Sequence, residues 1–229
     1  MIVVGTTLAA FAMDQRDTWS SWLKNAKEIK ASHPDGVQYF AAIQVDARGL
    51  EPFGPLLEAL AAIGGEYFTY SLDDGRTEVT TVNRLRHITM GQNVVSDYAV
   101  ATGASHLLFL AADLQPDPQT LPKLLELNHP LVGGEVRTYC LSGPNVEGFG
   151  FPVQEHMATA AYILIAREVF NRLRWRWDLD GKTDDPCLHY DAITLLNIPT
   201  LVRKDCIGKH YPEAIGAIET RGHDMKVHR

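Results

Sequence analysis

The sequence predicts a single α/β domain with a mostly parallel central sheet flanked by helices. Apolar runs of strand length alternate with segments of helical periodicity through the first half of the chain. The first run, MIVVGTTL, is continuous and β-branched, as expected of a strand covered on both faces. No internal repeat or linker divides the 229 residues. These observations favour one Rossmann-type domain over several small ones.

The elements of the first half follow one another with short connections. A helix is expected to follow each of the first three strands, and GlyGly after the second helix is a typical helix end. We expect strands at 1–8, 37–46, 66–72 and 106–110, and helices at 15–31, 52–65 and 80–102.

The second half is less regular. Five glycines and two prolines in residues 133–156 indicate irregular strands and a loop. Residues 159–175 are expected to run from a strand into a helix. Thr183, two acids and Pro186 are typical of a helix start over 183–199. A last strand then leads to His210.

The composition describes an ordinary acidic protein. The net charge is −7, so no basic stripe of the kind that binds nucleic acid non-specifically is expected. The three cysteines are widely spaced and form no CxxC motif, which favours a reducing compartment. The sequence holds no apolar stretch of the ~18 residues that a membrane span requires. We therefore expect a cytoplasmic protein with no membrane partner.

Acidic residues follow the expected strands at their carboxyl ends. Asp46 ends the second strand, Asp73–Asp74 follows the third, and Asp113 follows the fourth in HLLFLAADLQPDP. Ligands of open α/β sheets bind where these strand ends meet. Three acidic positions at one end of a sheet therefore indicate a ligand site.

The order of motifs resembles the GT-A-fold glycosyltransferases, which use nucleotide sugars and carry an Asp-x-Asp metal motif. GQN at 91–93 precedes LLFLAADLQPDP; LVGGEV, TAAYILIAREVF, TDDPCLHYDAITLLNIPT and CIGKH follow. The resemblance is to family-two-like members and covers about residues 1–212. It implies a GT-A-like, Rossmann-type domain. Its parts would be a nucleotide-sugar-binding half at 1–113, an acceptor and catalytic half at 114–212, and a tail at 213–229.

The resemblance implies a degenerate metal motif at the end of the fourth strand. The triplet is Ala111-Ala112-Asp113, so the first acid is missing and the last is kept. Asp113 and His210, which follows the last core strand, are the implied ligands of Mn²⁺ or Mg²⁺. A hard cation accepts carboxylate and substrate phosphate oxygens, and imidazole suits Mn²⁺. The plainer interpretation makes Asp113 a turn residue and His210 a surface or core histidine.

TDDP resembles the acidic motif where inverting members place their catalytic base. Asp185 aligns with the second acid of the family pair and is the first candidate, and Asp184 is the second. Such a carboxylate would deprotonate the acceptor hydroxyl, and a helix N-terminus would keep it ionised. The alternative is that both acids only complement the helix dipole.

The resemblance also implies a set of donor-binding positions. Asp46 matches a residue that contacts the nucleobase, often uracil, and two threonines end the first strand beside it. An Arg and an Asn on the long helix match positions near the donor, although Arg84 alone reads as a solvated helix residue. The implied donor-binding residues are Thr6, Thr7, Asp46, Arg84, Asn93 and Asp113.

The implied function is metal-assisted, inverting transfer of a hexosyl or pentosyl group from a nucleotide diphosphate sugar, with a UDP-sugar as the first candidate. The acceptor hydroxyl is open: a small molecule, a protein and a modified DNA base of the phage type are candidates. A nucleotidyltransferase of related fold is an alternative, although GTTLAAFAMDQR lacks the glycine-rich basic loop of that class. A non-catalytic nucleotide-sugar binder is the other, because the first acid is missing.

Overall fold

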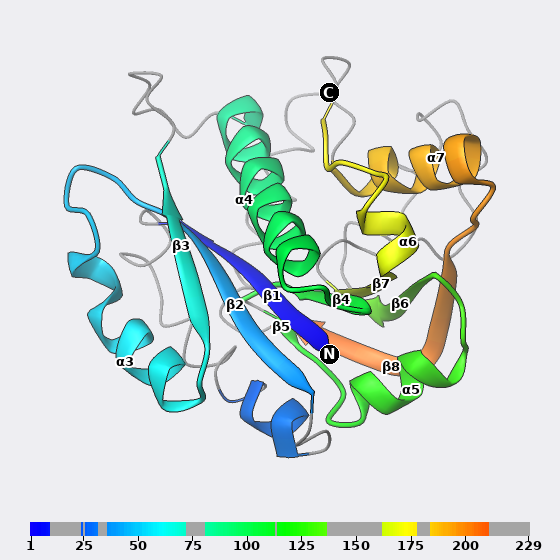
Figure 1. The fold of residues 1–229 in the computed structure, drawn as a ribbon, viewed down its shortest axis with the longest axis horizontal. Coiled ribbons are helices and arrows are strands. Elements are labelled where there is room, and N and C mark those ends of the chain that lie inside the picture. The colour runs from blue at the N-terminus through cyan, green and yellow to red at the C-terminus, as the bar shows by residue number, and fades with distance from the viewer. Residues whose placement is uncertain are drawn as a thin grey trace, which may run out of the picture.

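The structure is a computed structural model of the 229-residue chain. It describes residues 1–9, 24, 26–31, 36–71, 81–112, 114–136, 162–177 and 184–210, with side chains except at 81–85, 136, 184, 209 and 210. The predicted α/β domain with a mixed, mostly parallel sheet flanked by helices is confirmed (Figure 1).

Within the described residues the strands form one eight-stranded sheet, in the order β3-β2-β1-β4-β7-β6-β8-β5. Strands β1 to β4 are mutually parallel and lie close to the ranges expected from the sequence. The strands are β1 (Ile2–Ala9), β2 (Val37–Gln44), β3 (Glu66–Tyr70), β4 (His106–Leu110), β5 (Leu114–Gln115), β6 (Leu131–Val136), β7 (Tyr162–Ala166) and β8 (Leu201–His210).

Strand directions determine which residues lie at the same end of the sheet. Strand β7 is antiparallel to both β4 and β6, and β6 is parallel to β8. Strands β6 and β8 therefore point the same way as β1 to β4. The carboxyl ends of all six strands meet at one end of the sheet, which we call the carboxyl rim.

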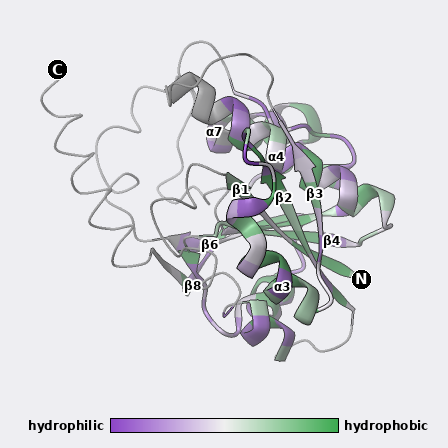
Figure 2. Ribbon diagram, turned by 90° about the vertical axis from the view of Figure 1, so that its left-hand side faces the viewer, coloured by the Kyte–Doolittle hydropathy of each residue, from purple (hydrophilic) through white to green (hydrophobic). Residues whose placement is uncertain are grey.

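Helices cover both faces of this sheet. The apolar cluster on one face includes residues of α3 (Gly54–Ala62), of α5 (Thr120–Glu126) and of the helical segment 26–31. The cluster on the other face includes residues of α4 (Thr81–Ala101), α6 (Arg167–Phe170) and α7 (Asp184–Leu196). Figure 2 shows mainly hydrophobic residues along the central strands and a mixture of hydrophilic and hydrophobic residues along the helices. A two-faced core of this kind explains the continuous apolar runs of β1 and β4.

Several elements differ from the sequence-based expectation. The helix expected to reach residue 175 ends at Phe170, and residues 173–177 are without regular structure. The two-residue strand β5 lies within DLQPDP at 113–118, and helix α5 follows this segment. No element was expected at either place. The helix expected at 52–65 begins with a 3-10 turn, η1 (Glu51–Phe53), and the chain after α3 turns at Gly64 with a positive φ of 70°. Most of the expected helix at 15–31 and of the loop at 133–156 lies outside the described residues.

Candidate functional site

The pairing of β5 with β8 brings together the two chain segments that carry the predicted metal ligands. Leu114 is the partner of His210 and Gln115 the partner of Lys209, in an antiparallel register. Asp113 is the residue directly before Leu114, and consecutive Cα atoms are about 3.8 Å apart. Asp113 itself and the side chain of His210 lie outside what the structure describes. The backbone pairing nevertheless fixes the chain positions beside them at the carboxyl rim.

A carboxylate and an imidazole form a donor set that fits Mn²⁺, and Mg²⁺ through the carboxylate. Among the described residues, no group of three or more His, Cys, Asp or Glu side chains gathers in a way that could hold a metal ion. This statement does not cover the predicted ligands, because Asp113 and the side chain of His210 lie outside the described residues.

Asp46 lies at the same rim, two residues after the end of β2. Its carboxylate accepts hydrogen bonds from the Arg48 guanidinium at 2.7 Å and from the Arg48 backbone N–H at 2.9 Å. These hydrogen bonds hold the pKa of Asp46 below the ordinary aspartate value of 3.8. The pair is partly exposed, so it orders the turn after β2 and adds little stability. An ionised, oriented carboxylate at a strand end is suited to accept hydrogen bonds from a ligand.

Thr6 and Thr7 lie within β1, three and two residues before its end at Ala9, and face opposite sides of the sheet. Thr6 is fully buried, and its Oγ1 has no hydrogen-bond partner. Thr7 lies under α4, where a side chain at Gly91 would come within 2.6 Å of Thr7 Cγ2 and of Tyr70 Oη. The glycine of the GQN motif therefore lets α4 approach the carboxyl rim closely. A buried hydroxyl without a partner is costly.

Asn93 has a partner that the family resemblance does not suggest. Its amide nitrogen donates to the Trp175 carbonyl at 2.9 Å, and its amide oxygen accepts from the Trp175 N–H at 3.0 Å. Trp175 is 5% exposed and also donates from Nε1 to Ser96 Oγ at 3.1 Å. Asn93 thus fastens the irregular segment 173–177 to α4, and its implied contact with the donor stays a prediction. The side chain of Arg84, the other implied donor residue of this helix, is not described.

Two further ion pairs hold the same segment. Arg174 pairs with Asp97 of α4, and both side chains are exposed. Arg176 makes a two-pronged contact with Asp191 of α7, at 2.7 and 2.8 Å. Segment 173–177 therefore connects α4, which covers β1 and β2, with the helix that begins at the acidic pair.

The acidic pair occupies the first turn of α7, as predicted. Asp184 is the first residue of the helix, and Asp185 is partly buried. Pro186 at the third position has no N–H and needs no acceptor in the first turn, and a helix N-terminus favours negative charge. The structure thus gives Asp185 the local setting of an ionised carboxylate.

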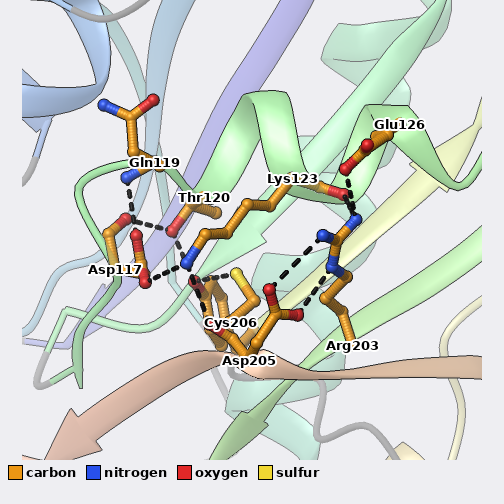
Figure 3. A network of polar contacts seen from close by, with 9 residues as sticks. Asp117, Gln119, Thr120, Lys123, Glu126, Arg203, Asp205 and Cys206 are labelled. Carbon is orange, nitrogen blue, oxygen red and sulfur yellow. Dashed lines mark hydrogen bonds and ion pairs between the residues drawn. The ribbon is translucent and has the colours of Figure 1, made fainter.

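Sequence reasoning missed a polar network between α5 and β8 (Figure 3). Asp117 accepts from the Gln119 N–H at 2.7 Å at the start of α5, and also from Lys123 Nζ at 2.7 Å. Lys123 reaches on to the carbonyl of Asp205, at 2.9 Å. The signal was present in the sequence, because an Asp followed by Pro is typical of a turn in which the carboxylate accepts from the backbone N–H two residues on. The contact with β8 joins residues 82 positions apart, and no local pattern predicts it.

Comparisons with known proteins give structural neighbours only. No family model matches the chain, and no curated protein matches its sequence. An active-site mutant of LgtC aligns with a TM-score of 0.48, 15% identity, and coverage of 76% of this chain and 60% of that one. The galactosyltransferase LgtC with donor and acceptor sugar analogues aligns at 0.41 and 16%, covering 72% and 58%. The glycosyltransferase GlyE of Streptococcus pneumoniae aligns at 0.40 and 15%, covering 89% and 45%. The chain thus spans 45–60% of the length of these glycosyltransferases.

A search of the described helices for a membrane span finds none with the length and apolar character to cross a bilayer.

Proposed function

We propose that this chain is a glycosyltransferase that moves a sugar from a nucleotide diphosphate sugar, with a UDP-sugar as the first candidate, to an acceptor hydroxyl. The observation that carries the proposal is the pairing of Leu114 with His210, which joins the segments of both predicted metal ligands at the carboxyl rim. Asp46 lies two residues after the end of the parallel strand β2, at the same rim. Carboxylates and an imidazole at the carboxyl rim suit a diphosphate held by a divalent cation.

The residues of the chain divide into donor-binding and acceptor-activating groups. The nucleoside would bind near Thr6 and Thr7 of β1 and near Asp46, which follows β2. Asp113 and His210 would hold Mn²⁺ or Mg²⁺, which when bound offsets the negative charge of a departing diphosphate. Asn93 and Arg84 of α4 are the other proposed donor-binding residues. Asn93 also binds the backbone of Trp175. This division matches a donor half at 1–113 and an acceptor half at 114–212.

Asp185 is the proposed general base, with Asp184 as the alternative. The acceptor oxygen attacks the anomeric carbon, the bond from that carbon to the diphosphate oxygen breaks, and the acceptor proton passes to the carboxylate. This displacement inverts the anomeric configuration. The setting at a helix N-terminus supports an ionised base at neutral pH.

One observation favours a second candidate, a nucleotide-sugar-binding protein without catalysis. Ala111 and Ala112, which stand where the family has its first acid and the spacer, pack against the apolar cluster of the sheet. The segment that usually contacts the donor thus contributes to the core instead. This candidate predicts donor binding without turnover for any acceptor.

The deciding experiment is thermal stabilisation by a panel of nucleotide sugars, with and without Mn²⁺, for the native chain and Asp113→Ala. A ligand at a hundredfold excess over its Kd adds about 2.7 kcal/mol, which raises the Tm of a domain of this size by roughly 5–10 °C. We expect one donor to give a Mn²⁺-dependent shift that Asp113→Ala loses. Asp97→Ala, which removes an exposed carboxylate of α4, is the matched control and should keep the shift.

The two candidates separate in a second step. Release of the nucleoside diphosphate from the identified donor is measured for the native chain and for Asp185→Asn, which retains the shape of the side chain. Turnover that Asp185→Asn loses, with donor stabilisation kept, supports the transferase. Stabilisation without turnover supports the binding protein. No shift with any donor would refute the nucleotide-sugar site itself.

A further inference from the structure

Strand β8 contains a bulge that sets its pairing at the carboxyl rim. Along β6, Gly134 pairs with Arg203 of β8, but the next residue, Glu135, pairs with Ile207. Residues 204–206 therefore have no partner on β6. A bulge shifts the register of everything after it, and an odd shift moves side chains to the opposite face of the sheet. His210, which pairs with Leu114 of β5, lies after this shift.

Charged side chains of α5 and β8 hold the outside of the bulge (Figure 3). Lys123 Nζ donates to the Asp205 carbonyl at 2.9 Å. Arg203 binds the Asp205 carboxylate through Nε at 2.7 Å, and reaches the Lys123 carbonyl at 3.0 Å and Glu126 at 2.6 Å. Hydrogen bonds to backbone carbonyls replace part of the pairing that the bulge removes from β8.

A buried chain of polar groups holds the inside of the bulge. Tyr162 Oη lies 3.0 Å from Cys206 Sγ and also contacts Thr120 Oγ1, and Thr120 in turn contacts the Asp117 carbonyl. Tyr162, Cys206 and Thr120 are each 0% exposed. A side chain at Gly134 would lie 2.0 Å from the Tyr162 ring and 2.8 Å from the Cys206 carbonyl. Gly134 thus provides the space that both groups occupy.

The Asp117 carbonyl, the last acceptor in this series of hydrogen bonds, determines which group donates in each of them. A carbonyl only accepts, so Thr120 donates to Asp117, Tyr162 donates to Thr120, and Cys206 donates its S–H to Tyr162. Burial, the main cause, raises the pKa of Cys206 and keeps the thiol protonated. Each hydroxyl or thiol therefore has one assigned acceptor. Removal of one group leaves a buried neighbour without a partner, which is costly.

We propose that Tyr162 and Cys206 are positioning residues for the metal site: they fix the 204–206 bulge and thereby hold His210 opposite the segment of Asp113. The inference rests on the proposed function, because it takes His210 as a metal ligand. Neither residue contacts the metal or the substrate. Groups that orient a metal ligand commonly change metal affinity about 10- to 100-fold when they are altered.

The test measures Mn²⁺ binding to the full chain by titration, with the electron paramagnetic resonance signal of free Mn²⁺ as the readout, well below the Tm of every variant. We expect Tyr162→Phe and Cys206→Ala to weaken Mn²⁺ binding about 10-fold. Cys206→Ser supplies an O–H donor at the same place and should restore the native affinity. Cys187→Ala, which truncates the buried cysteine of α7, is the matched control and should bind Mn²⁺ as the native chain does.

Amide hydrogen exchange of residues 207–210 provides a second readout, in which exchange rises in Tyr162→Phe and Cys206→Ala and returns in Cys206→Ser. A purely structural role lowers the Tm of both variants and leaves the Mn²⁺ affinity unchanged; that result overturns the inference and leaves the proposed function intact. Failure of the native chain to bind Mn²⁺ refutes the metal site and the inference with it. If Tyr162→Phe does not fold, the Cys206→Ala and Cys206→Ser pair decides.

Discussion

Truncation of Asn93 distinguishes a residue that fastens the chain from one that binds a donor. Asn93→Ala removes both hydrogen bonds to the Trp175 backbone, at 2.9 and 3.0 Å. The N–H and the carbonyl of Trp175, a residue that is 5% exposed, then lose these partners. A buried polar group left unpaired costs about 1–3 kcal/mol, so we expect a total loss of roughly 3 kcal/mol. For a domain of this size that corresponds to a fall in Tm of roughly 6–12 °C.

The assay is calorimetric melting together with urea denaturation, which separates a change in stability from a change in exposed surface. Asn171→Ala, at an exposed position after α6, is the matched control and should change stability by less than about 0.5 kcal/mol. Asn93→Asp keeps the acceptor for the Trp175 N–H but places a carboxylate against the Trp175 carbonyl, so it should also destabilise. An Asn93→Ala chain that melts like the native one and fails to bind the donor would refute this reasoning and restore the donor contact.

The remaining predictions concern packing and pH. Gly134→Ala should destabilise the chain severely, because its Cβ would lie 2.0 Å from the Tyr162 ring, whereas Gly54→Ala in α3 meets nothing within 4 Å and should be tolerated; urea denaturation of the two variants tests the contrast. Stability should fall as the pH rises above about 9–10, because burial raises the pKa of Tyr39, Tyr70 and Tyr162. These phenols ionise first in the unfolded chain, which then binds fewer protons than the folded one. Thermal melting from pH 7 to 11 measures the loss, and a flat profile would contradict it.

The first half of the fold was predictable because its signals are local. Strands β1 and β4 are buried on both faces and are marked by apolar runs, and α4 lies within one residue at each end of the range expected from its sequence. The turn after α3 follows from Gly64, where a positive φ is needed. Each of these features depends on residues that are close to one another in the sequence.

The rest depends on contacts that no local pattern contains. The helix expected to reach residue 175 ends at Phe170, and the backbone of Trp175 instead binds Asn93, which lies 82 positions away. The bulge of β8 contains Cys206, and its buried contact is Tyr162, which lies 44 positions earlier in the sequence. The candidate site divides in the same way: the acids at strand ends were predictable, and the groups that hold those strands in register were not.

The position of β4 has a consequence for synthesis on the ribosome. On one side β4 pairs with β1, and on the other with β7, which belongs to the second half of the chain. Until residues 162–166 have emerged, the wholly apolar stretch Leu107–Leu110 presents an open edge to solvent and to neighbouring nascent chains. The two halves therefore cannot mature one after the other as separate units. A split of the gene after residue 113 should yield fragments that associate when made together and aggregate when made alone.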